Sequence, residues 1–71
     1  MDISNDEIRT AIARWINGPH AERNRAILER RLIDGICYEP LAEEFDLSVR
    51  QVKNIVYRSE EKLFYHLRKS K

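Results

Sequence analysis

Residues 38–56 read YEPLAEEFDLSVRQVKNIV, and two helical patterns meet inside this stretch across a turn of only two residues. The first pattern places Leu41, Ala42 and Phe45 on one side of a helix predicted over about residues 38–45. A turn this short does not allow two helices to pack side by side, so it predicts a sharp corner between them. We therefore expect a helix-turn-helix.

The helix after the turn is predicted over about residues 49–67, and it begins with a capping signal. Ser48 can accept a hydrogen bond from the backbone of Gln51, whose side chain can reach back to the backbone of Ser48. Positions on one face of this helix are apolar apart from a serine, and they are Val52, Ile55, Val56, Ser59, Leu63 and Leu67. Such a face predicts burial along the length of the helix.

The residues of the turn itself fit a corner between helices. Ala42 is small enough to let the two helices approach closely, and Leu47 is placed to plug the turn. The corner also requires one residue near the left-handed backbone region, and Asp46 occupies that position. Asp tolerates this conformation better than most residues, although less well than Gly.

The first helix of the chain is predicted over about residues 5–16. Ser4 and Glu7 have the spacing of another capping box, and Ile3 before the cap can pack on Ile8 as a hydrophobic staple. The apolar face of this helix consists of Ile8, Ile12, Trp15 and Ile16.

A further helix is predicted over about residues 19–34. It lies between Asn17-Gly18-Pro19, which stops the preceding helix, and Gly35, which ends this one. Its apolar positions are Ala21, Ile27, Leu28, Leu32 and Ile33. Because the strand-like alternation of apolar and polar residues is missing, the sequence predicts a single all-α domain over residues 1–71, with four helices and a helix-turn-helix.

The distribution of charge is more informative than its total. The 71 residues carry 13 basic and 12 acidic side chains, a net charge of +1. Residues 1–46 hold six basic and ten acidic side chains, whereas residues 47–71 hold seven basic and two acidic ones. This asymmetry favours a polyanion as the partner of the last third of the chain, although a solvated helix face would also be charged.

Several classes of protein are excluded by composition. One cysteine, Cys37, cannot form an internal disulfide, and with His20 and His66 it lacks the spacing of a metal site, so no metal or cofactor is expected. Cys37 and His20 also lack an orienting group, and we expect no catalytic activity. No apolar run approaches the roughly 20 residues of a membrane span, and the acidic N-terminus is unlike a signal peptide. A cytoplasmic protein without membrane contact is expected.

The helix after the turn carries the candidate DNA contacts. Arg50, Gln51 and Asn54 lie in its first two turns, where Arg can pair with guanine and Asn or Gln with adenine. A second group suits contacts to phosphates, which position a protein without reading sequence, and it consists of Ser48, Lys53, Tyr57, Arg58 and Lys62.

A known family shares the pattern of these segments. Arg23–Glu29, Ile33–Ser48, Val52, Tyr57-Arg58 and Leu63 resemble region 4 of the bacterial sigma-70 type transcription initiation factors, over about residues 19–67. The resemblance implies a four-helix domain that reads the promoter −35 element from the major groove and contacts RNA polymerase. It implies a free-standing regulator of bacterial or phage type, because the other sigma domains are not represented here. The chain resembles the DNA-binding domain of LuxR-type response regulators less closely.

Some positions depart from the sigma pattern, and a second interpretation stays open. Cys37, Pro40, Asp46 and Ser59 replace a Ser or Thr cap, a Glu, a Gly and an Ala, which bears on stability and on the geometry of the corner. The alternative function is a protein-interaction module that docks on RNA polymerase or another regulator without reading a groove. The helix over residues 5–16 lies outside the resemblance and is a candidate for homodimer formation.

Overall fold

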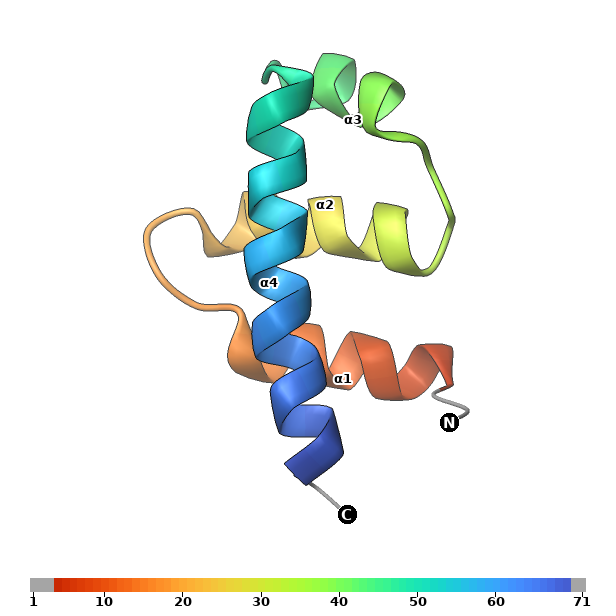
Figure 1. The fold of residues 1–71 in the computed structure, drawn as a ribbon, viewed down its shortest axis with the longest axis vertical. Coiled ribbons are helices and arrows are strands. Elements are labelled where there is room, and N and C mark those ends of the chain that lie inside the picture. Colours follow the sequence, from red (N-terminus) through yellow and green to blue (C-terminus); the bar gives the residue numbers. More distant parts are fainter. Residues whose placement is uncertain (1–3, 70–71) are drawn as a thin grey trace.

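The computed structural model describes residues 4–69 and places four helices in them: α1 (Asn5–Trp15), α2 (Ala21–Leu32), α3 (Tyr38–Glu44) and α4 (Val49–Lys69). α4 is the longest helix, and the other three helices pack against it (Figure 1). α3 lies at the N-terminal end of α4, α1 lies towards its C-terminal end, and α2 crosses α4 between them (Figure 1). The predicted all-α fold with four helices is confirmed.

Three helices begin at the predicted residues 5, 38 and 49, and the other boundaries differ from the predicted ones by one or two residues. α1 ends at Trp15, because Ile16 already has extended backbone angles. α2 begins at Ala21 instead of residue 19 and ends at Leu32, since His20 has non-helical angles and Ile33 is the C-cap. α3 stops one residue early, at Glu44, and α4 continues two residues beyond 67, to Lys69.

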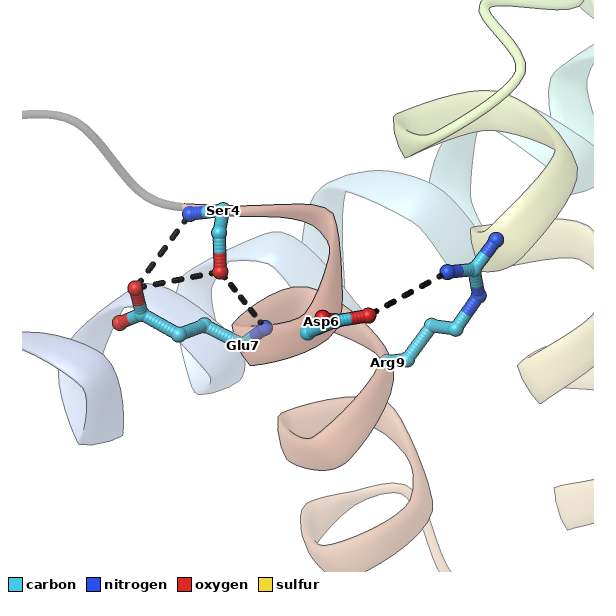
Figure 2. Close-up of polar contacts among 4 residues, drawn as sticks. All are labelled: Ser4, Asp6, Glu7 and Arg9. Atoms are coloured by element: carbon cyan, nitrogen blue, oxygen red, sulfur yellow. Dashed lines mark hydrogen bonds and ion pairs between the residues drawn. The ribbon is translucent and has the colours of Figure 1, made fainter.

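Two helices begin with the predicted reciprocal capping hydrogen bonds. At the start of α1, the Glu7 backbone N–H donates to Ser4 Oγ at 3.2 Å, and the Ser4 N–H donates to Glu7 Oε1 at 3.4 Å (Figure 2). At the start of α4, Gln51 N–H donates to Ser48 Oγ at 3.1 Å, and Ser48 N–H donates to Gln51 Oε1 at 2.9 Å. The staple predicted between Ile3 and Ile8 lies outside the described residues.

The core consists of the apolar faces that the sequence predicts, where the four helices meet. Its fully buried side chains come from all four helices and are Ile12, Ile27, Leu28, Leu41, Val52, Val56 and Leu63. Ser59, the polar member of the α4 face, is 9% exposed. Trp15 is only partly buried and packs against the edge of this core.

The corner between α3 and α4 has the predicted backbone geometry. Asp46 has a φ of 56° and is the only non-glycine residue with positive φ in the described part of the chain. This left-handed residue reverses the chain, so that the Leu47 N–H donates to the Ala42 carbonyl at 2.8 Å. Ala42 is 6% exposed, and Leu47 packs against the core. A small buried residue and a left-handed residue thus both occupy the positions predicted for the turn.

Side chains from distant segments connect the helices further. Arg25 on α2 donates to the Ile16 carbonyl at 2.8 Å and to Asn17 Oδ1 at 3.1 Å, which holds the end of α1. Arg30 Nε lies 2.7 Å from Glu44 Oε1, an ion pair that joins α2 to α3.

No helix in residues 4–69 is both long enough and apolar enough to cross a membrane.

Candidate functional site

The exposed side of α4 carries two of the predicted base contacts with their polar groups unengaged. Arg50 and Asn54 are exposed and lie about one turn apart, while Val52 and Val56 on the other side of the helix are fully buried. Within residues 4–69, neither side chain takes part in a hydrogen bond, an ion pair or a ring contact. The core thus fixes the backbone of these turns while the guanidinium and the amide stay available to a ligand.

Gln51 and Ser48 are exposed too, but the capping box already engages them. Gln51 Oε1 accepts the Ser48 N–H at 2.9 Å. A bidentate contact with adenine uses both the oxygen and the nitrogen of an amide, so the cap and such a contact compete for Oε1. Ser48 Oγ accepts from Gln51 N–H at 3.1 Å and keeps its own proton for donation to a phosphate.

One flank of α4 faces the beginning of α2. A shallow hollow lies there, lined by Arg23 of α2, by Leu47 of the corner, and by Gln51, Asn54, Ile55 and Arg58 of α4. Two guanidinium groups from distant parts of the chain therefore border the same hollow. Arg23 Nε donates to Asn24 Oδ1 at 3.2 Å, which leaves its terminal nitrogens as donors.

The opposite flank of α4 faces the end of α2 and the beginning of α3. The Tyr38 ring has Arg31 Cζ at 4.5 Å and Lys53 Nζ at 5.7 Å from its centre, and the Tyr57 ring meets it edge-on at 6.3 Å. A hydrogen bond to Tyr38 raises the pKa of Tyr57, and the charge of Glu60 adds to this effect while that of Arg31 opposes it. Tyr57 is 53% exposed, and a phosphate would compete with Tyr38 for its single phenolic proton.

Lys62 lies apart from these groups. It borders a different hollow, towards the C-terminal half of α4, with Arg58 and Arg68. Twelve residues of helix separate it from Arg50, a rise of about 18 Å. Of the predicted phosphate contacts, Ser48, Lys53, Tyr57 and Arg58 surround the first turns of α4, and Lys62 does not.

The two helices of the corner have opposite charge. α4 carries six basic side chains and two acidic ones. α3 and the corner carry Glu39, Glu43, Glu44 and Asp46 without a basic residue, and only Glu44 forms an ion pair in the described part of the chain. Most basic side chains of this region thus lie on α4 and near the two ends of α2.

Three residues near α4 were not among the predicted contacts: Arg23, Arg31 and Tyr38. Arg23 and Arg31 come from α2, and their proximity to α4 depends on how α2 crosses it (Figure 1), whereas Tyr38 begins α3 and lies near α4 because of the corner. One sequence feature could have indicated Arg23 and Arg31, because basic residues lie close to both ends of the predicted helix over 19–34.

Within residues 4–69, no group of three or more His, Cys, Asp and Glu side chains could hold a metal ion.

Comparisons with protein-family models, with curated proteins and with solved structures gave no match to the chain.

Proposed function

We propose that the chain binds double-stranded DNA sequence-specifically, with α3 and α4 as a helix-turn-helix, and that it regulates transcription. The observation that supports this most strongly is the first two turns of α4. They present the unengaged side chains of Arg50 and Asn54 between two flanks that are rich in cationic and hydroxyl groups.

In this proposal the first turns of α4 enter the major groove. Arg50 donates to the O6 and N7 acceptors of guanine, and Asn54 pairs with N6 and N7 of adenine. Gln51 contributes through its amide nitrogen as long as Oε1 caps the helix. Base readout therefore depends mainly on Arg50 and Asn54.

The flanks of α4 supply the contacts to the two DNA strands. Arg23 and Arg58 lie on one side, and Arg31, Lys53 and Tyr57 lie on the other. Arg23 and Arg31 are eight residues apart on α2, a rise of about 12 Å, which is comparable to the width of about 12 Å of the major groove. A helix that crosses behind α4 can therefore support phosphate contacts on both borders of the groove.

The resemblance to region 4 of the sigma-70 factors supports regulation of transcription as the role. The resembling segments contain Arg23, Leu47 of the corner and Arg58, which border the same hollow beside α4. Contact with RNA polymerase is a further expectation from the same resemblance.

The test is fluorescence anisotropy with labelled duplexes, one selected from a random pool by the protein and one of random sequence. Arg50→Ala and Asn54→Ala should each weaken binding to the selected site by about 1 to 3 kcal/mol. On random DNA, Asn54→Ala should bind almost as wild type and Arg50→Ala only slightly more weakly. If Asn54→Ala weakened binding to the selected and the random duplex equally, base readout by α4 would be contradicted.

Phosphate contacts are tested in the same assay by salt. Lys53→Ala and Arg58→Ala should weaken both duplexes alike and make the slope of log affinity against log salt shallower by about one unit each. Lys69→Ala is the matched control, since it removes one exposed positive charge from the last turn of α4, away from the proposed contacts. With about four phosphate contacts, raising salt from roughly 50 to 200 mM should cost wild type on the order of a hundredfold in affinity.

A second function is favoured by the acidic surface of α3. Glu39, Glu43 and Asp46 are exposed and form no ion pair within residues 4–69, so this surface could dock on a basic patch of RNA polymerase or another regulator. The two functions differ in their affinity for random duplex DNA. Groove binding gives salt-dependent affinity through counterion release, whereas a module that only docks on protein gives almost none.

A further inference from the structure

A shallow hollow follows the outer side of α1, at the end of α4 that is remote from Arg50 and Asn54. Its lining residues recur along α1 at helical spacing, with one side chain from α4 as the second wall, and those used below are Asp6, Glu7, Thr10, Arg14, Trp15 and Leu67. Trp15 and Leu67 are partly buried and pack against the core from this side. The hollow therefore combines apolar walls with charged ends.

The charges along this hollow are arranged symmetrically. The acidic residues Asp6 and Glu7 occupy the first turn of α1, and Arg14 occupies the last turn. Thr10 lies midway between Asp6 and Arg14 in sequence, and each step of four residues is about one helical turn. If a second α1 lay antiparallel to the first with a twofold axis at Thr10, each Asp6 would face the Arg14 of the other copy.

We propose that a second copy of this chain occupies this hollow, with the two α1 helices antiparallel. The interface is isologous, so each favourable contact between Asp6 and Arg14 occurs twice. The antiparallel arrangement also places the positive N-terminal end of each helix dipole beside the negative C-terminal end of the other. Trp15 and Leu67 lose exposed apolar surface in the dimer.

The charge pattern selects a second copy over an unrelated partner, because the surface is complementary to itself. An α1 of 11 residues is only about 16 Å long, which places the interface below the roughly 1,200 Å² of a standard stable complex. The dimer is therefore weak, with a dissociation constant of about micromolar or above. It forms at the end of α4 opposite the proposed DNA contacts and does not depend on them (Figure 1).

The experiment is sedimentation equilibrium of the purified chain and of two charge-reversal variants, Asp6→Lys and Arg14→Glu. Asp6 is chosen over Glu7 because Glu7 belongs to the capping box, whereas Asp6 only pairs with Arg9 at 3.7 Å and its side chain is 95% exposed (Figure 2). Glu22→Lys is the matched control, since it reverses an exposed charge in the first turn of α2. Circular dichroism checks that each variant is folded.

Wild type should associate with rising concentration up to about 500 µM, as expected of a small interface. Asp6→Lys alone and Arg14→Glu alone should each raise the dissociation constant at least about tenfold, because each dimer then contains two like-charge contacts. An equimolar mixture of the two variants should associate within about threefold of wild type, because both cross contacts regain opposite charges. Glu22→Lys should behave as wild type.

Three outcomes would overturn the proposal. If wild type stayed monomeric at all these concentrations, a second copy of the chain would not be the occupant of the hollow. If Asp6→Lys associated with the same dissociation constant as wild type, the dimer interface would not be formed by α1. Folded variants whose mixture fails to associate would exclude the antiparallel pairing of Asp6 with Arg14.

Discussion

The two ends of α4 are held in different ways. At the α3 end, the chain turns within two residues, and the contacts that form the corner are backbone hydrogen bonds and a capping box between neighbours in sequence. At the α1 end, the contacts come from side chains distant in sequence, including the stack of Trp15 on His66 with ring centres 3.7 Å apart. At the first end the contacts of the corner leave the side chains of Arg50 and Asn54 unengaged, whereas the second end uses its side chains to hold α1.

The largest expected effect is at the α1 end. Ile12 is 1% exposed, and Ile12→Ala should lower the free energy of unfolding by about 2 to 5 kcal/mol through lost burial and a cavity. Urea denaturation followed by circular dichroism measures it. Ile33→Ala, the same change at a partly buried position, should cost clearly less. Equal losses for the two variants would show that side-chain burial does not hold the α1 end.

At the α3 end, the corresponding disruption is overpacking. Ala42 is 6% exposed and its carbonyl accepts the Leu47 N–H at 2.8 Å, so a larger side chain must push the two helices apart. Ala42→Leu should lower the free energy of unfolding by about 1 to 3 kcal/mol. Ala13→Leu, the same substitution at an exposed position of α1, should stay within about 0.5 kcal/mol of wild type. An unchanged denaturation midpoint for Ala42→Leu would mean that the corner is not tightly packed.

The same contrast explains how much of the molecule could be predicted from sequence. The corner depends on Ala42, Asp46, Leu47 and the capping pair, all within ten residues, so local rules were enough to predict it. The exposed faces of α4 follow from the helical period, which correctly placed Arg50 and Asn54 at the surface.

The contacts that could not be predicted join segments far apart in sequence. Arg25 reaches the carbonyl of Ile16, and His66 stacks on Trp15. The proximity of Arg23 and Arg31 to α4 depends likewise on the crossing angle of α2, which helical periodicity does not specify. Periodicity gives the buried face of a helix but not the direction in which its neighbour runs, so the flanks of the candidate site were visible only in the structure.

A smaller effect tests the backbone at the α3 end. Asp46 has a φ of 56°, where Gly is unstrained and other residues are not. Asp46→Gly should be neutral or stabilising by up to about 1 kcal/mol, since relief of strain is offset by the greater freedom of Gly in the unfolded chain. Asp46→Ala, which keeps a Cβ but loses the tolerance of Asp for this region, should be destabilising. A loss of more than about 1 kcal/mol in Asp46→Gly would reveal a specific role for the carboxylate.

The smallest expected effect concerns Tyr57, beside the α3 end, and it appears only at alkaline pH. A hydrogen bond to Tyr38 raises the pKa of Tyr57 above its ordinary value of 10.0, which means that the folded state holds the phenolic proton more tightly than the unfolded state. The stability from this bond is therefore fully present below pH 10 and is lost as pH rises through the folded-state pKa. Wild type should exceed Tyr57→Phe in thermal midpoint near neutral pH, and the difference should shrink above pH 10.

Tyr65→Phe is the matched control for this measurement, because Tyr65 is also 53% exposed on α4 but lies outside the Tyr38 pair. It corrects for the general alkaline titration of the chain, which affects all variants. The effect should be small, because Tyr57 is half exposed and solvent competes for its hydroxyl. If the gap between wild type and Tyr57→Phe stayed constant across pH 10, the tyrosine pair would contribute packing alone. The phenolic proton of Tyr57 would then not be engaged by Tyr38 and would be available to a phosphate.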